Sequence, residues 1–177
     1  MTLRCFVASF LDRPSADLLA AAARQALAQL GPGARALRAV APENYHVTLR
    51  FLGAQPAAAV APLQALVGSL QGHPVTAQVL TIGGFPRARR ALVQAAELAA
   101  QPQLQAWAVA LGEQLGPGDR PFRAHITLAR ARRPLYLPPL VLDEPLAVTL
   151  AAPLLYRSDT RRDGAVYQAL LPGDTLS

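Results

Sequence analysis

The hydrophobic and polar positions along the chain follow two periods. Apolar residues at every second position predict strands, and apolar residues spaced three and four apart predict helices. Strands are predicted at residues 2–10, 34–41, 45–52, 75–82, 91–98, 122–129, 146–155 and 165–171. Helices are predicted at residues 15–30, 56–70 and 102–115. Because the strands come in pairs between helices, we expect an α+β fold with antiparallel sheet rather than a doubly wound parallel sheet.

Length and composition predict one folded domain over residues 1–177. The chain has 177 residues, of which 52% are hydrophobic and 16% are charged. That apolar share can fill a core, and it argues against disorder, which goes with few apolar residues and many charges. No stretch of the sequence has the composition of a long linker between independent domains.

All seventeen basic residues are arginine, and eleven acidic residues leave a net charge of +6. The absence of lysine excludes a Walker-type phosphate loop, a Schiff base and a ligase that works through a lysyl-adenylate. The excess positive charge favours an anionic partner such as a phosphate or a nucleic acid.

The single cysteine and the N-terminus limit the setting in which the protein works. Cys5 alone allows neither an intramolecular disulfide nor a cysteine zinc site, and its place in an apolar strand predicts a buried thiol. The N-terminus has no signal-peptide pattern, and no apolar run is long enough to span a membrane. We therefore expect a soluble, cytoplasmic protein.

An internal repeat is the most informative feature of the sequence. Pro42-Glu43-Asn44-Tyr45-His46-Val47-Thr48-Leu49 returns as Pro121-Phe122-Arg123-Ala124-His125-Ile126-Thr127-Leu128. A single His-x-Thr on a strand usually marks a half-buried polar pair, but two copies with matching proline, apolar and leucine positions are hard to explain by chance. The repeat therefore predicts a site built from both copies.

Strand alternation places each histidine on the same face as the threonine two residues later. If the two strands lie side by side about a pseudo-twofold axis, the pairs His46–Thr48 and His125–Thr127 converge on one cleft. Histidine titrates near neutrality, so one ring can accept a proton while the other donates one. Threonine hydroxyls and arginine guanidinium groups can bind phosphate oxygens. This combination favours acid–base chemistry on a phosphate ester.

On these motifs the sequence resembles the 2H phosphoesterases, which are named for two His-x-Thr/Ser-x motifs. It is similar to the RNA 2′,3′-cyclic phosphodiesterases, the LigT-like proteins also called 2′-5′ RNA ligases. The resemblance rests on residues 46–53 and 121–130, and it extends to Phe6-Val7-Ala8, Phe85-Pro86-Arg87 and Leu155-Tyr156-Arg157-Ser158. It implies two pseudo-symmetric lobes of antiparallel sheet, with helices outside and the active-site cleft between them.

The resemblance also implies an activity, namely metal-independent hydrolysis of a 2′,3′-cyclic phosphate end to a 2′-phosphate. His46 would be the proton donor to the leaving 3′-oxygen, and His125 would be the proton acceptor that activates water. Thr48, Thr127 and Arg130 would bind the phosphate. No metal and no cofactor is expected, and the expected partner is RNA or an oligonucleotide with a cyclic end, bound by a monomer.

One of these assignments conflicts with simple alternation. Strict alternation puts Arg130 on the core side, so the strand must end or bulge near Ala129. Arg50 is the alternative phosphate ligand. Glu43, three residues before His46, could orient that ring, and His73 is expected at a surface turn. The sequence by itself does not decide which histidine is the acid.

Alternative functions and binding residues stay open at this stage. The same chemistry could act on another cyclic phosphate, on a 2′-5′ oligonucleotide, or in reverse as a 2′-5′ RNA ligase. A non-enzymatic RNA-binding module is a further alternative. Four aromatic side chains could stack a base or fill the core, and these are Phe85, Phe122, Tyr136 and Tyr156.

Overall fold

Nine strands form one open antiparallel sheet in the computed structural model, which describes residues 1–162 and 164–174. The strands are β1 (Thr2–Phe10), β2 (Leu37–Ala39), β3 (His46–Pro56), β4 (Val75–Phe85), β5 (Ala91–Leu98), β6 (His125–Leu135), β7 (Leu140–Leu150), β8 (Leu154–Arg161) and β9 (Gly164–Ala169). The helices are α1 (Arg13–Gln29), α2 (Val60–Ser69) and α3 (Pro102–Leu115), with short 3-10 turns at Gly31–Ala36, Pro42–Asn44 and Ala57–Ala59. The strand order is β7-β4-β5-β6-β3-β1-β8-β9, and β2, which lies outside this order, also pairs with β6.

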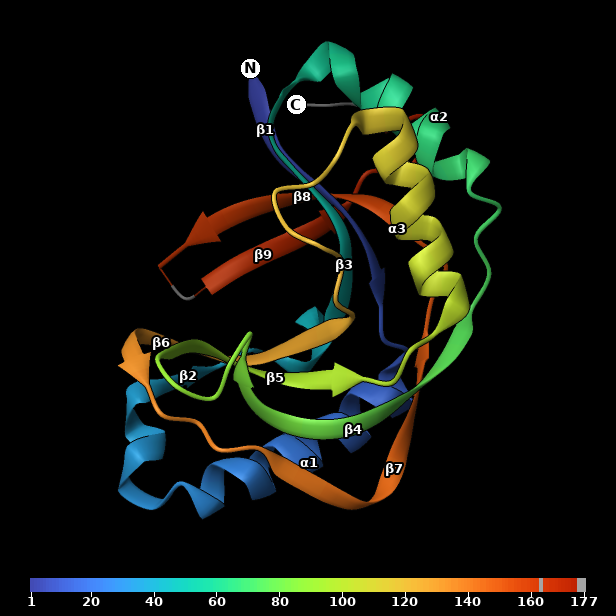
Figure 1. The fold of residues 1–177 in the computed structure, drawn as a ribbon. Coiled ribbons are helices and arrows are strands. Elements are labelled where there is room, and N and C mark those ends of the chain that lie inside the picture. Colours follow the sequence, from blue (N-terminus) through green and yellow to red (C-terminus); the bar gives the residue numbers. More distant parts are fainter. Residues whose placement is uncertain (163, 175–177) are drawn as a thin grey trace.

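The sheet is divided into two lobes at the junction of β3 and β6. A single residue pair, Val47 opposite Ile126, links these two strands in the described part of the chain. The first lobe contains β3, β1, β8 and β9, and the second contains β6, β5, β4, β7 and β2 (Figure 1). Each lobe carries one copy of the repeat on the strand at the junction. The α+β fold with two lobes of antiparallel sheet, predicted above, is confirmed.

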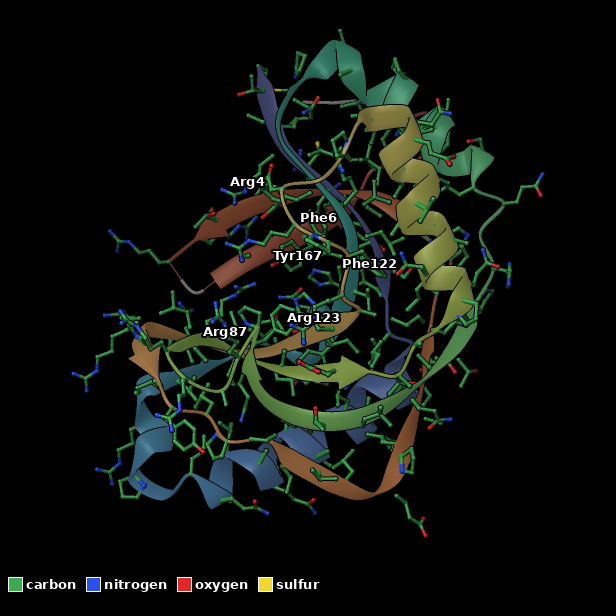
Figure 2. All side chains as sticks on the ribbon, viewed as in Figure 1. Arg4, Phe6, Arg87, Phe122, Arg123 and Tyr167 are labelled. Carbon is green, nitrogen blue, oxygen red and sulfur yellow. The ribbon has the colours of Figure 1, made fainter. Side chains whose placement is uncertain are left out.

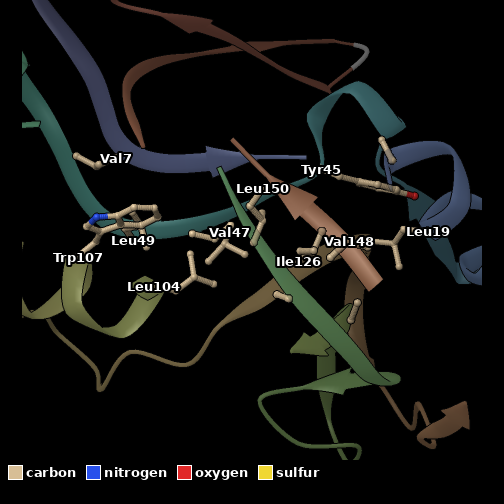
Figure 3. Packing of buried hydrophobic residues seen from close by; sticks show 14 of the residues in the cluster. Val7, Leu19, Tyr45, Val47, Leu49, Leu104, Trp107, Ile126, Val148 and Leu150 are labelled. Carbon is tan, nitrogen blue, oxygen red and sulfur yellow. The ribbon is translucent and has the colours of Figure 1, made fainter. Parts of the chain in front are cut away.

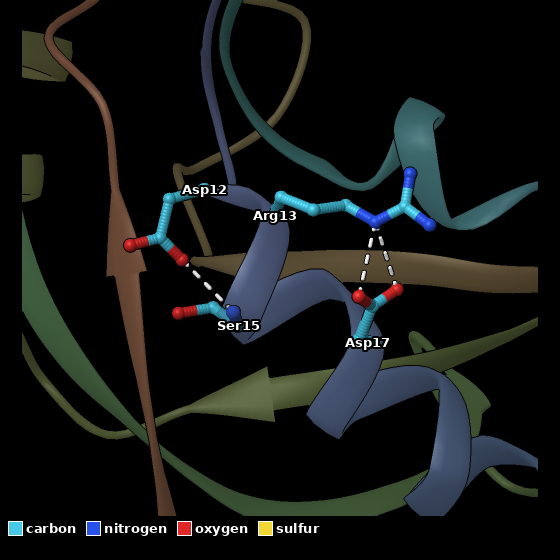
Figure 4. A network of polar contacts seen from close by, with 4 residues as sticks. All are labelled: Asp12, Arg13, Ser15 and Asp17. Atoms are coloured by element: carbon cyan, nitrogen blue, oxygen red, sulfur yellow. Dashed lines mark hydrogen bonds and ion pairs between the residues drawn. The ribbon is translucent and has the colours of Figure 1, made fainter.

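Helix α1 begins where the sequence supplies a cap. The Asp12 side chain accepts a hydrogen bond of 2.9 Å from the backbone N–H of Ser15, which satisfies one of the free donors of the first turn (Figure 4). Arg13 and Asp17 add an exposed ion pair one turn apart. The Ser15 hydroxyl accepts from the backbone N–H of Thr149, which ties the start of the helix to β7.

Both motif strands take part in the hydrophobic core. Val47 and Leu49 on β3 and Ile126 and Leu128 on β6 are buried. Around them pack Leu104 and Trp107 of α3, Leu19 of α1, Val7 of β1 and Val148 and Leu150 of β7 (Figure 3). The residues between these core positions are therefore held on the opposite face of the sheet, where the candidate site lies.

The structure differs most from the predicted elements in three segments. The strand predicted at 34–41 covers only Leu37–Ala39, and residues 34–36 end a 3-10 turn, because Gly31, Pro32 and Gly33 favour tight turns over extended chain. The strand predicted at 122–129 starts at His125 and runs to Leu135. The strand predicted at 146–155 is the end of one strand, Leu140–Leu150, and the start of another, Leu154–Arg161, separated near Pro153.

Candidate active site

The two motif strands bring both His-Thr pairs together at the junction of the lobes. Val47 lies opposite Ile126 in an antiparallel pair, so one step along the ladder sets His46 beside Thr127 and Thr48 beside His125. Valine and isoleucine point into the core, and the four polar side chains share the other face. The geometry predicted from the repeat is thus present, with each histidine next to the threonine of the other copy.

Each imidazole ring is held by the same kind of contact, with the backbone carbonyl two residues before it. Nδ1 of His46 lies 2.7 Å from the carbonyl oxygen of Asn44, and Nδ1 of His125 lies 2.7 Å from that of Arg123. A carbonyl can only accept, so each Nδ1 carries the hydrogen and donates it. The other ring nitrogen, Nε2, is then the one that can bind or release a proton in the cleft. The orienting group for His46 is therefore this carbonyl, and no contact among the described residues supports the suggestion that Glu43 orients the ring.

A β-bulge follows each motif at the same position. In the β1–β3 ladder Val7 pairs with Arg50 and Ala8 with Thr48, so Leu49 is the extra residue. In the β5–β6 ladder Gln94 pairs with Ala129 and Ala95 with Thr127, so Leu128 is the extra residue. Each bulge lies three residues after its histidine and reverses the alternation beyond it.

The bulges decide which side chains join the site. Arg130, five residues after His125, is exposed and lines the pocket that contains His46. The bulge expected near Ala129 is thus confirmed, and the core placement that strict alternation gives Arg130 is wrong. Phe51 occupies the matching position five residues after His46 and also faces the cleft.

His46 lies in an aromatic environment. Its ring stacks on Phe10 with centroids 4.8 Å apart, contacts Phe6 at 5.3 Å and meets the edge of Tyr167 at 5.2 Å. This burial lowers the pKa of His46 to about 4, and the positive charge of Arg130 acts in the same direction. Burial in the same cluster raises the pKa of Tyr156 to about 12. In the free protein at neutral pH, His46 is therefore uncharged.

His125 has a more polar environment. Its ring stacks on Phe85 at 3.8 Å, and the Arg123 guanidinium lies over the Phe85 ring at 4.8 Å. Arg123 also pairs with Glu97 at 2.7 Å and donates to the carbonyl oxygen of Pro86 at 3.1 Å. Burial lowers the pKa of His125, Arg123 lowers it further, and the Glu97 carboxylate partly opposes both effects.

Two adjacent pockets make up the cleft. The smaller, about 290 Å³, is lined by His46 and Arg130 together with Arg4, Phe6, Thr48, Phe51, Ser158, Thr160, Ala165 and Tyr167. The larger, about 810 Å³, contains His125 and is bordered by α3 and the loop before β6, with Arg50, Arg120 and Arg123 among its lining residues. Thr48 and Phe51 line both. Figure 2 shows Arg4, Phe6 and Tyr167 on the first lobe, facing Arg87 and Arg123 on the second.

The remaining candidates are engaged in contacts other than those around the two histidine rings. Arg50 donates to the carbonyl oxygens of Pro117 at 3.2 Å and Leu115 at 3.5 Å, so its guanidinium holds the loop after α3. His73 is exposed and meets the edge of Trp107, as expected for a surface turn. Cys5 is fully buried, which confirms the structural thiol. Among the described residues, no group of three His, Cys, Asp or Glu side chains could hold a metal ion.

Several residues around the histidines were not identified from the sequence. Phe10, Tyr167 and Phe51 carry no motif of their own, and their roles depend on strand pairing between distant segments. The register places Phe10 opposite His46 and Phe6 opposite Phe51. A signal was available only for Phe51, because the bulge inferred for the second copy could have been applied to the first.

Comparisons with known proteins find one matching family model and solved structures of similar fold. Residues 14–93 match the family model described as LigT like Phosphoesterase. A structure of TT0787 from Thermus thermophilus is 31% identical, with a TM-score of 0.76 over 95% of both chains. Escherichia coli LigT complexed with NADP+ is 27% identical, with a TM-score of 0.75 over 96% of both chains. The same E. coli protein complexed with 3′-AMP gives 27% and 0.73 over 96% of both chains.

The chain belongs to the LigT-like phosphoesterases of the 2H phosphoesterase superfamily. The match to the family model contains the first His-x-Thr motif and ends before the second, whereas the structural similarity to TT0787 covers 95% of the chain. Among curated proteins none matches this sequence. No helix in residues 1–162 or 164–174 is both long and apolar enough to cross a membrane.

Proposed function

We propose that the protein hydrolyses the 2′,3′-cyclic phosphate at the end of an RNA or oligonucleotide to a 2′-phosphate, without a metal ion. One observation carries the proposal. Two histidines, each fixed through Nδ1 by a backbone carbonyl, stand beside each other's threonines at the junction of two lobes. A binding site alone has no need for two titratable rings oriented in the same way, whereas an acid–base reaction does.

The reaction requires opposite protonation of the two rings. His125 Nε2 takes a proton from water, and the water oxygen forms a bond to phosphorus. The bond from phosphorus to the 3′-oxygen breaks, and that oxygen takes the proton from His46 Nε2. The phosphate stays on the 2′-oxygen. His125 ends protonated and His46 neutral, and proton exchange with solvent resets the pair.

The substrate itself supplies the charge that His46 needs. In the free protein burial keeps this ring neutral, so its proton is stabilised only when an anion enters the pocket. A bound cyclic phosphate is such an anion. Arg130 and the hydroxyls of Thr48 and Thr127 would bind its oxygens, and Arg130 lies in the same pocket as His46. In this proposal His46 is the proton donor and His125 is the proton acceptor, which are the roles that the family resemblance implies.

The nature of the ligand is supported by charge and by the relatives. The structures of E. coli LigT include complexes with phosphate and with 3′-AMP, which contain the groups this site would bind. The net charge of +6 and the arginines around the larger pocket suit a longer polyanion. Both motifs come from one chain, so a monomer contains the whole proposed site.

The test is hydrolysis of a nucleoside 2′,3′-cyclic phosphate and of a cyclic-ended oligonucleotide in excess EDTA, with 2′- and 3′-phosphate products resolved. We expect only the 2′-phosphate. Replacing His46 or His125 with alanine should lower kcat by about 10²- to 10⁴-fold, and His73→Ala should leave it unchanged. Each single variant should cost nearly as much as the double variant, because the two rings act together.

Other outcomes would lead to other functions. Activity that appears only after metal is added would contradict the mechanism. Joining of 2′-5′ ends by the same two histidines would assign the reverse reaction. RNA binding that survives loss of both histidines, with no turnover on any cyclic substrate, would make the protein a binding module.

A further inference from the structure

His125 has less aromatic support than His46. Three aromatic rings surround His46, whereas among the described residues Phe85 is the one ring stacked on His125. The two rings have centroids 3.8 Å apart and planes inclined by 15°. Phe85 is the last residue of β4 and is only partly buried. The plane of the His125 ring therefore depends on how firmly Phe85 is itself held.

The backbone that leads to Phe85 is fixed by close packing. A Cβ atom on Gly83 would lie 2.9 Å from the Cα of Pro139, so only glycine fits there. The backbone N–H of Gly84 donates to the carbonyl oxygen of Leu137 at 3.0 Å. These contacts place the Cα of Phe85, but they leave its ring free to turn about the side-chain bonds.

Arg123 restricts the ring of Phe85. Its guanidinium carbon lies 4.8 Å from the ring centroid, within the range of a cation–π contact. Nη2 donates to the carboxylate of Glu97 at 2.7 Å, and Nη1 donates to the carbonyl oxygen of Pro86 at 3.1 Å. The guanidinium cannot turn away from the ring without losing both hydrogen bonds.

The backbone of Arg123 also contacts His125. Its carbonyl oxygen accepts the hydrogen bond from Nδ1 of His125 at 2.7 Å. The backbone of Arg123 thus sets the direction in which Nε2 points, and its side chain, through Phe85, limits rotation of the imidazole plane. Glu97, which holds the guanidinium, lies opposite His125 in the β5–β6 ladder. One residue therefore acts on the imidazole by two routes.

Arg123 lines the larger pocket, where an arginine could also serve as a phosphate ligand. Its hydrogen bonds and its ring contact favour a different role. To bind a phosphate through Nη1 or Nη2, the guanidinium would have to give up or share the contacts with Glu97 and Pro86. In its present position it holds protein groups together.

We propose that Arg123 is a positioning residue, which fixes the plane of the His125 ring through Phe85 so that Nε2 meets the water that attacks phosphorus. The inference rests on the proposed function, because His125 needs a fixed orientation only if it accepts a proton in the cleft.

Steady-state kinetics on a nucleoside 2′,3′-cyclic phosphate tests the proposal. Arg123→Met should lower kcat by about tenfold and leave KM unchanged, because a displacement of about 1 Å can cost up to about 10²-fold and the backbone carbonyl remains. Arg123→Lys should lose as much, because lysine keeps the charge but lacks the flat, forked group. A cyclic-ended oligonucleotide should show the same losses.

Variants of Phe85 test the route. Phe85→Leu should lower kcat as Arg123→Met does, and Phe85→Tyr, which keeps the ring, should retain activity. The double variant should be no worse than either single variant, because the two side chains act through one contact. Arg89→Met is the matched control, since Arg89 also lies over an aromatic ring, that of Tyr136, but lines neither pocket.

The pH profile separates positioning from charge. Burial lowers the pKa of His125, the hydrogen bond to the Arg123 carbonyl raises it, and the charge of Arg123 lowers it further. The other charges that act on the ring are those of Glu97 and Arg130. Loss of charge alone would displace the profile along the pH axis, whereas loss of positioning lowers its maximum. Arg123→Lys should lower the maximum without displacing the profile.

NMR of histidine-labelled protein observes the ring without any substrate. The ring current of Phe85 shifts the carbon-bound protons of His125, and His125→Ala identifies their signals. This shift should decrease in Arg123→Met, while the signals of His46 stay in place.

The outcomes separate this proposal from the function on which it rests. Unchanged His125 shifts in Arg123→Met overturn it, and so do changed shifts with an unchanged kcat. A loss confined to KM or to the oligonucleotide overturns it in favour of a phosphate contact. A displaced pH profile with an unchanged maximum overturns it in favour of charge. If the wild type hydrolyses no cyclic phosphate but the shift is still lost in Arg123→Met, the proposed function falls and the positioning contact stands.

Discussion

The two histidines share one local design and differ in what surrounds it. Each ring donates through Nδ1 to the carbonyl two residues before it, and each strand bulges three residues later. Around His46 the contacts are the rings of Phe6, Phe10 and Tyr167. Around His125 they are one ring, Phe85, and the Arg123–Glu97 ion pair. The repeat thus supplies two imidazole rings held in the same way, and residues outside the repeat give them different surroundings.

Of the changes that test this difference between the two halves of the site, we expect the largest loss of activity at Arg130, which follows the bulge of the second motif. Arg130→Met should lower kcat/KM for a cyclic phosphate by about 10- to 150-fold, the value of a hydrogen bond to a charged group. Arg50→Met should lower it by less than about fivefold, because Arg50 donates to backbone carbonyls of the loop after α3. Steady-state kinetics on both variants checks the order. A larger loss for Arg50→Met would instead support Arg50 as the phosphate ligand, which is the alternative considered from the sequence.

The second effect concerns the pH dependence of stability. The pKa of His46 is about 4 in the folded protein, below its ordinary value of 6.5, so the unfolded chain binds a proton that the folded chain does not. The free energy of unfolding should therefore fall as pH drops from 6.5 towards 4, by at most about 3 kcal/mol from this group. His46→Phe, which keeps an aromatic ring, should remove that part of the slope.

Urea unfolding at several pH values, with wild type and His46→Phe compared at each, measures this difference. Above about pH 6.5 the free energy of unfolding should depend on pH in the same way in both proteins. Below that pH it should fall faster in the wild type than in His46→Phe. Parallel pH profiles for the two proteins would show that the surroundings of His46 do not keep the ring neutral.

The smallest effect is expected at the ion pair near His125. Glu97→Gln removes a carboxylate that opposes the lowering of the His125 pKa, so the pKa should fall further. The Arg123–Glu97 pair is substantially exposed, and its loss should change stability by less than about 1 kcal/mol. Titration of the His125 ring followed by NMR checks the direction. A rise in the pKa would mean that Glu97 acts on His125 in some way other than through its charge.

Local patterns predicted most of the fold and the central part of the site. The helices at 102–115 and near 15–30 and the strands at 2–10 and 91–98 follow from periodicity, because each depends on its own residues. The His-Thr pairs follow from a repeat that can be read directly. Phe10 and Tyr167 could not be placed, since they reach His46 through pairing between segments more than thirty and a hundred residues apart. Tertiary pairing, rather than local propensity, decides such contacts.

The extra residue at Leu128 makes the second motif sensitive to the length of its strand. Beyond that leucine, a one-residue change in register exchanges the two faces of the strand. Insertion of one residue between Ala129 and Arg130 would leave every charged residue of the site in the sequence, yet, with the bulge retained, it would turn Arg130 towards the core. All the expected side chains would still be present in such a protein, and only the spacing between His125 and Arg130 would show that the guanidinium proposed to bind phosphate no longer faces the cleft.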